Sequence, residues 1–181
     1  MPYAVTHFLM PALLVALWRD YHLKKHEKRT FPLHYVLIAG LGGVLPDIDI
    51  ITYLFLQPFG FSYSDIHRTI THSLFPILIL VFLGFIFHRI KVNVLGNHKI
   101  KLSIICWVLS FSFFIHILLD ALITGETIKL LYPFSHFTLW SNLTDILPQH
   151  LSPLFTPLLD GILLIIWIIY LEAKHKISDF I

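Results

Sequence analysis

The sequence of 181 residues has little charge and almost no cysteine. Asp, Glu, Lys and Arg make up 13% of it, about half of the roughly 25% found in soluble domains. The one cysteine, Cys106, excludes an internal disulfide and a thiolate metal cluster. A net charge of +2, scattered along the chain, excludes a nucleic-acid-binding surface. Hydrophobic residues make up 56% and fall in long blocks, which indicates an integral membrane protein.

Crossing a bilayer as a helix takes about 20 predominantly apolar residues. Five stretches qualify, two of them marginally: residues 2–18, 33–56, 70–88, 102–124 and 154–171. The first stretch runs into Trp18, Arg19 and Asp20 without a small-residue cleavage site, so we interpret it as a retained span and not a signal peptide. The sequence therefore predicts an all-α membrane bundle of five spans, one domain over residues 1–181.

Basic residues are distributed unevenly between the segments that join these spans. Segments 19–32 and 89–101 and the C-terminal tail hold 11 of the 13 Lys and Arg residues. The intervening segments, 57–69 and 125–153, hold one each. Because positive charge stays in the cytoplasm, we predict an outer N-terminus and an inner C-terminus. The long 125–153 segment is rich in Pro and aromatic residues, which predicts an interfacial or re-entrant cap on the outer side.

Polar side chains inside membrane spans are costly and mark functional sites by default. Every predicted span contributes to one set: His7, Asp47, Asp49, His72 with His67 just before it, His116, Asp120 and Asp160. At 1.5 Å per helical residue, all of them fall about 3–13 Å below the outer surface. Randomly placed polar residues would not choose one leaflet in all five spans, so we expect these side chains to converge.

Local spacing supports this convergence. His116 and Asp120 are four residues apart and so share one helix face, as two ligands of one metal ion do. Asp47 and Asp49 are two apart and would diverge on a regular helix. However, the glycines and the proline of the run GGVLPDID interrupt the helix there, so we expect both carboxylates to turn toward one cavity.

Imidazole and carboxylate ligands without thiolate indicate zinc, or manganese or iron, and not calcium. Three or four histidines with two to four aspartates suit two or three ions, which lower the pKa of water and clamp the oxygens of a displacement at phosphorus. We expect Asp47 or Asp49 to bridge metals or act as a base. Arg68 is the only arginine of the outer segments, and we expect it to hold a phosphate oxygen.

Each residue also has a structural interpretation. A lone histidine in a membrane helix, such as His7, more often hydrogen bonds to a neighbouring helix than binds a metal. Asp160 has the alternative of pairing with a loop donor. The roles of Glu126, His136 and His150, in the outer segment where a solvated position is the default, stay open.

The order of these motifs resembles a known family. His7, GGVLPDID, HRTITHS, HILLD and YPFS occur in the order typical of the YdjM-like family of small inner-membrane proteins described as metal-dependent hydrolases, over roughly residues 1–136. That family is distantly similar to zinc-dependent phospholipase C and the P1-type nucleases, all-helical enzymes that hydrolyse phosphate esters at a His/Asp zinc cluster. The resemblance implies metal ligation by His7, Asp47 or Asp49, His67 or His72, and His116 with Asp120. The further ligands of the soluble enzymes have no motif match here.

Together, these observations predict a metal-dependent hydrolase of the inner or plasma membrane, acting from the extracytoplasmic side on a phosphate ester of a phospholipid or lipid-linked substrate. One alternative is a metal or proton transporter or sensor, which needs polar groups that continue to the cytoplasmic face. The inner halves of the predicted spans show none. Another alternative is a non-catalytic scaffold, whose structural metal would have every coordination position filled by protein.

Overall fold

The computed structural model describes residues 4–24, 31–90, 93–94, 100–123, 127–135, 137–139, 148 and 151–175. Its helices are α1 (Ala4–Leu23), α2 (His34–Val44), α3 (Asp49–Leu56), α4 (Tyr63–Ile66), α5 (Leu74–Ile90), α6 (Leu102–Ile123) and α7 (Ser152–His175). The 3-10 turns η2 (Leu45–Ile48) and η3 (Gln57–Phe59) bracket α3. Strand β1 (Asn93–Val94) pairs antiparallel with β2 (Ile100–Lys101), as β3 (Ile128–Lys129) does with β4 (Thr138–Leu139). The predicted all-α class is confirmed.

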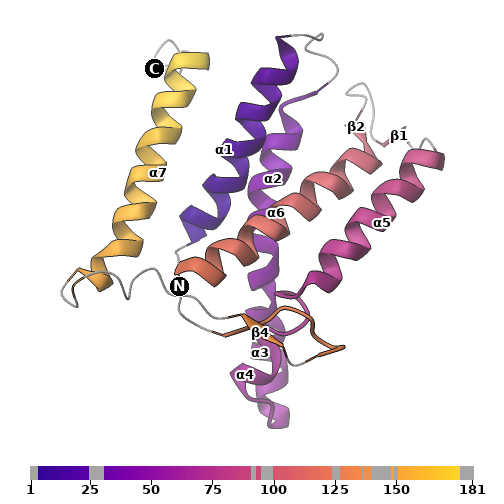
Figure 1. The fold of residues 1–181 in the computed structure, drawn as a ribbon, viewed down its shortest axis with the longest axis vertical. Helices are drawn as coiled ribbons and strands as arrows, with labels where there is room; N and C mark the ends of the chain where they lie inside the picture. Colours follow the sequence, from indigo (N-terminus) through magenta and orange to yellow (C-terminus); the bar gives the residue numbers. More distant parts are fainter. Residues whose placement is uncertain are drawn as a thin grey trace.

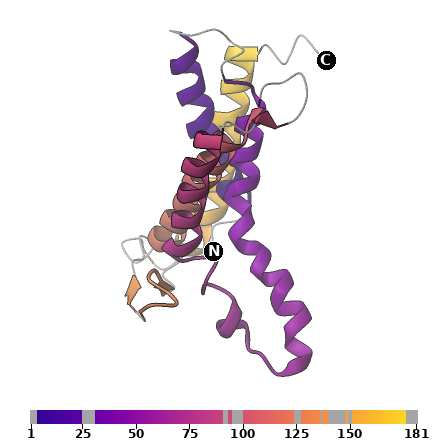
Figure 2. The ribbon, with the colours of Figure 1, turned by 90° about the vertical axis from the view of Figure 1, so that its right-hand side faces the viewer.

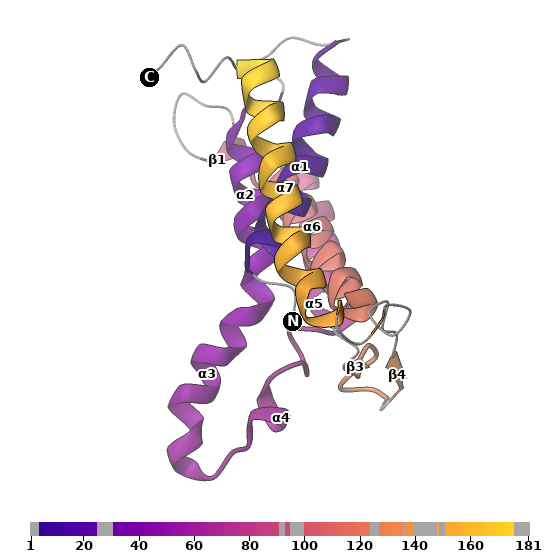
Figure 3. The same cartoon turned by 90° about the vertical axis from the view of Figure 1, so that its left-hand side faces the viewer.

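The five long helices lie side by side in one bundle (Figure 1). Helix α2 packs against both α1 and α6, α5 packs on α6, and α7 packs on α1 at the far edge. Helix α2 continues through η2 into α3, so that α3 and α4 form an arm beyond the bundle (Figures 2 and 3). The bundle thus has an end with the arm and an end without it.

The connections alternate between these two ends. The end of α1, the β1–β2 hairpin and the end of α7 lie together at the end away from the arm (Figure 1). We call it the basic end, because the described parts of the Lys- and Arg-rich segments 19–32 and 89–101 lie there. The α3–α4 arm and the β3–β4 hairpin lie at the opposite end, which we call the arm end. This grouping is the one that the distribution of Lys and Arg predicts; which end faces the cytoplasm stays a prediction.

Three helical stretches of the described residues are long and apolar enough to cross a membrane: His34–Phe59, Leu102–Ile123 and Ser152–Lys174. They correspond to the second, fourth and fifth predicted spans. Helix α5 is apolar but has only 17 residues, and α1 includes Arg19 and Asp20. The count of five spans therefore stays a prediction.

The third predicted span, 70–88, begins too early. His72 does not lie on the first helical turn, because α5 starts only at Leu74. Residues 67–73 instead form an irregular segment that joins α4 to α5. Helix α4 before it is held by Ser62, whose N–H and hydroxyl both donate to the Asp65 carboxylate and lower the pKa of Asp65.

Helices α1 and α2 approach closely through small residues. A Cβ on Gly40 would lie 2.6 Å from the Phe8 ring, and a Cβ on Gly43 would collide with the backbone carbonyl of His7. Because Gly40 and Gly43 have no Cβ atom, α1 can approach α2 closely, and His7 lies beside the break in α2. The buried core here is apolar and consists of Ala12, Val15, Ala16, Phe31, Tyr35, Val36, Ala39, Ile100 and Val108.

We expect Gly43→Ala to lower the stability of the protein by about 1–3 kcal/mol, because its methyl group meets backbone that cannot rotate away. The matched control is Gly161→Ala on α7, where a Cβ has nothing within 4 Å. The measurement is the thermal unfolding midpoint in detergent. Equal midpoints for the two variants would contradict the close approach of α1 and α2.

Candidate metal centre

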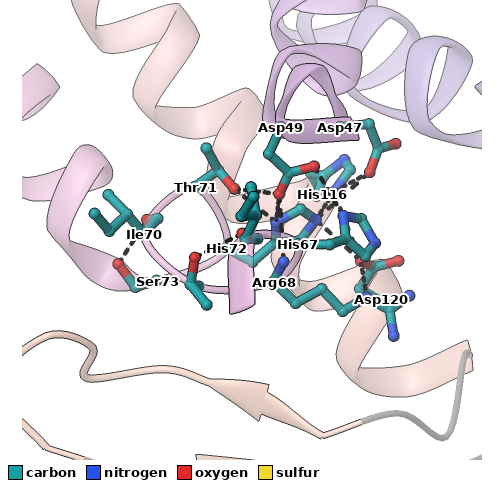
Figure 4. Close-up of polar contacts among 12 residues, drawn as sticks. Asp47, Asp49, His67, Arg68, Ile70, Thr71, His72, Ser73, His116 and Asp120 are labelled. Atoms are coloured by element: carbon teal, nitrogen blue, oxygen red, sulfur yellow. Dashed lines mark hydrogen bonds and ion pairs between the residues drawn. The ribbon is translucent and has the colours of Figure 1, made fainter. Parts of the chain in front are cut away.

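The predicted polar residues meet where α2 breaks into α3 (Figure 4). Asp47 lies in η2 and Asp49 starts α3, while His116 and Asp120 project from α6. Four different segments contribute, since His7 comes from α1 and the 67–73 segment supplies the remaining residues, His67, Arg68 and His72. The structure thus brings together eight of the nine residues singled out in the sequence; the expectation that Asp160 joins them is wrong, because it pairs with Thr6 instead.

Asp49 accepts hydrogen bonds from several directions and is 4% exposed. Its Oδ1 lies 2.8 Å from Nδ1 of His67. Its Oδ2 lies 3.3 Å from Nδ1 of His72 and accepts the Thr71 hydroxyl at 2.7 Å and the Arg68 N–H at 3.3 Å. Nδ1 of His72 also lies 3.0 Å from the Thr71 hydroxyl oxygen. Acceptors at the Nδ1 atoms of both histidines fix their tautomers, and both Nε2 atoms point away from Asp49.

His116 is oriented by a backbone carbonyl. Its Nδ1 lies 2.7 Å from the oxygen of Gly43, so Nδ1 carries the proton and Nε2 keeps its lone pair. The Gly43 carbonyl is available because residue 46, which would donate to it in a 3-10 turn, is a proline without an N–H. The GGVLP run therefore does more than break the helix: it orients a histidine on another helix.

Three donor atoms form a triangle whose sides are close to the distances between the ligand atoms of one metal ion. The Nε2 atoms of His72 and His116 are 3.1 Å apart, and Oδ2 of Asp120 lies 3.5 and 3.6 Å from them. Tetrahedral zinc with bonds of about 2.0–2.1 Å requires ligand atoms about 3.3–3.4 Å apart. All three residues are at most 1% exposed. With both Nδ1 atoms protonated, the two Nε2 lone pairs face each other beside a carboxylate, which is costly without a proton or a metal cation between them.

Asp47 lies on the other side of the same histidine pair. Its Oδ1 is 3.5 Å from Nε2 of His72 and 3.6 Å from Nε2 of His116. Its side chain is 22% exposed, more than any other carboxylate of the cluster. Asp47 therefore marks the accessible edge of the cluster.

Two further ring nitrogens are buried and have no hydrogen-bond partner among the described residues. They are Nε2 of His67 and Nδ1 of His7. In each case the opposite nitrogen faces a carboxylate: Nδ1 of His67 faces Asp49 at 2.8 Å, and Nε2 of His7 faces Asp120 at 3.4 Å. Metal-binding histidines are arranged in this way: one ring nitrogen hydrogen bonds to a carboxylate or carbonyl, and the other binds the metal ion.

Arg68 is a buried cation beside these carboxylates. It is 5% exposed, and its Nε lies 3.7 Å from Oδ2 of Asp120. Its backbone has φ of 59°, a conformation that side-chain-bearing residues rarely adopt outside constrained sites. This conformation directs its N–H to Asp49 and its side chain toward Asp120 (Figure 4).

Asp160 lies outside the cluster and has a structural contact. It accepts hydrogen bonds from both the N–H and the hydroxyl of Thr6, the neighbour of His7. Asp160 thus fastens α7 to the first turn of α1. Glu126, His136 and His150 lie outside the described residues.

The model of a known family matches residues 1–177. The chain belongs to the YdjM inner membrane protein family. No curated protein and no solved structure matches the chain. Membership of the YdjM family agrees with the apolar helices, and the match extends beyond the region 1–136 that carries the resemblance in the sequence.

Proposed function

We propose that this YdjM-family chain is a metal-dependent hydrolase that cleaves a phosphate ester of a phospholipid or lipid-linked substrate. The observation that carries the proposal is the buried set of four histidines. Each has one nitrogen engaged by a carboxylate or carbonyl and the other turned toward the cluster or left without a partner. This arrangement is costly in an empty polar cluster and suits a metal site.

The residues present fit a divalent ion. His72, His116 and Asp120 would hold it, with Asp47 beside the same pair. The free nitrogens of His67 and His7 offer ligands for one or two more ions. Mixed nitrogen and oxygen donors suit zinc, with manganese or iron as alternatives. A bound ion of this kind supplies Lewis acidity and lowers the pKa of water.

The other residues have distinct roles in this proposal. Arg68 binds an oxygen of the substrate phosphate, since a buried guanidinium beside a metal site is stabilised by an anion. Asp49 positions His67 and His72 rather than ligating, because its oxygens are occupied by hydrogen bonds. Asp47, at the accessible edge, is the carboxylate placed to accept a proton from the attacking water.

A lipid substrate is supported by where the cluster lies. The helical rod His34–Phe59 passes the cluster at Asp47, about 20 Å from its first residue, with roughly 18 Å of helix beyond. The helix beyond, α3, exposes apolar side chains such as Ile51, Leu54 and Phe55. With His34 at one surface of a hydrocarbon core about 30 Å thick, the cluster lies about 10 Å below the other surface, within the leaflet of that surface. The distribution of Lys and Arg in the sequence supports an extracytoplasmic position for this leaflet.

Transport is the less supported alternative. Between the cluster and the basic end, the described core of α1, α2 and α6 contains apolar residues such as Val15, Val36 and Val108. The buried polar residues of α6 on this side are serines, Ser103, Ser110 and Ser112, which carry no ionisable group. An ion pathway needs polar groups that continue along its length.

The decisive experiment is hydrolysis by the purified protein in detergent. We expect release of phosphate or a phosphorylated headgroup from a phospholipid or lipid-linked phosphate, lost on chelation and restored by zinc, manganese or iron. Sealed right-side-out vesicles should release the product without permeabilisation. Failure across a broad lipid panel, with metal demonstrably bound, would reject phosphoester chemistry. Product formed only after permeabilisation would reverse the orientation.

A further inference from the structure

A second candidate site lies at the basic end, between α1 and α6. A groove of about 730 Å³ opens there, a volume typical of ligand sites. It is lined by Leu14, Val15, Trp18, His22, Phe31, Lys101, Ile104, Trp107, Val108 and Phe111. Its lining along α1, from Leu14 to His22, is about 12 Å long by the helical rise. That is close to the depth of one leaflet of a bilayer, about half of 30 Å.

Polar groups gather at one end of this groove, whereas its walls are aliphatic and aromatic. Lys101 is exposed at the mouth, and His22 stands beside Trp18 and Phe31. Trp18 is 55% exposed, as an aromatic residue at a membrane interface would be.

Two described cations lie beside the groove: Lys101 lines it, and Arg19 donates from Nε to the backbone oxygen of the lining residue Phe31 at 3.0 Å. The lining residues Trp18 and Phe31 bracket segment 19–32, and Lys101 ends segment 89–101. Together these segments carry nine Lys and Arg residues and only two acidic ones. The positive charge of Lys101 and Arg19 therefore favours an anion at the mouth.

We propose that this groove binds an anionic phospholipid, with one acyl chain between α1 and α6 and the phosphate at Lys101. The length, the apolar walls and the basic mouth each match one part of that molecule. A zwitterionic phospholipid fits the walls equally but gains less from the positive charge. The site lies at the opposite end from the metal centre, and it does not depend on the proposed hydrolase.

The test uses quenching of Trp107 fluorescence by lipids with brominated acyl chains. A variant with Trp107 as its only tryptophan is placed in phosphatidylcholine vesicles that contain a low mole fraction of brominated phosphatidylglycerol or brominated phosphatidylcholine. We expect stronger, saturable quenching by phosphatidylglycerol. Lys101→Gln should weaken this preference about fivefold, the effect of one cation near a lipid phosphate. Lys174→Gln, an exposed cation of α7 that does not line the groove, should leave it unchanged.

Ile104→Phe provides a steric test, because a larger ring fills the groove without changing charge. It should lower quenching by both brominated lipids. Equal quenching by the two lipids, or a preference that survives Lys101→Gln, would overturn the proposal. Crosslinking that shows a dimer shielding Trp107 from both lipids would overturn it too, and would assign the groove to a second copy of the chain.

Discussion

His116→Ala should abolish stoichiometric metal binding while the protein still inserts and folds. The Nε2 of His116 is one corner of the triangle with His72 and Asp120, and its removal leaves two of the three donors. We expect a loss of affinity greater than the 10–100-fold that removal of a partner outside the coordination shell costs. Asp120→Ala should have the same effect. Elemental analysis of purified protein, with chelator competition for affinity, measures both.

The control for these variants is His88→Ala, which removes an exposed histidine near the end of α5. It should retain the full metal content. Asp49→Asn should have an intermediate effect, because the Asp49 oxygens face the Nδ1 atoms of His67 and His72 and so orient both rings without binding the metal themselves. Its affinity should fall by about 10–100-fold. Unchanged metal content in His116→Ala and Asp120→Ala would remove α6 from the site.

The convergence of the polar residues could be predicted because a membrane limits where they can lie. His116 and Asp120 share a helix face by spacing alone, and the structure places both in the cluster. Counting residues along the predicted spans gave His7 and Asp47 a similar depth below the outer surface, and both lie in the cluster. Burying polar groups in lipid is costly, so sequence positions alone carry much of this information.

The roles within the cluster could not be predicted in the same way. Sequence analysis treated Asp47 and Asp49 alike, whereas the structure gives Asp49 two histidines and a threonine, and leaves Asp47 at the accessible edge. This difference arises from η2, whose turn separates the directions of the two side chains. No residue type in the sequence reports such a turn beyond the helix-breaking proline itself.

The contact between His116 and the Gly43 carbonyl was missed for a similar reason. A sequence does not show which backbone carbonyls accept hydrogen bonds from side chains. Only the position of Pro46 indicates that the Gly43 carbonyl lacks its usual backbone donor. The pairing of Asp160 with Thr6 joins residues 154 positions apart. The alternative of a loop donor was therefore right that Asp160 has a structural partner, but wrong about the donor, which belongs to helix α1.

Arg68→Gln should separate substrate binding from metal binding. The metal content should stay unchanged, because a guanidinium is a cation with no lone pair to offer a metal ion. Hydrolysis should fall by about 10²–10³-fold, as it does when one group that stabilises transition-state charge is removed. Glutamine keeps the backbone N–H that donates to Asp49, so the histidines stay oriented. Metal analysis and kcat/KM on the same preparations measure the two effects.

Two comparisons make this prediction specific to the phosphate. Arg68→Lys keeps the charge but loses the planar pair of donors, so part of the activity should return. Lys129→Gln removes the other basic residue of the predicted outer segments, on β3, and should leave kcat/KM unchanged. If Arg68→Gln loses its metal together with its activity, the guanidinium supports the cluster structurally through Asp120. If it keeps both, Arg68 does not contact the substrate.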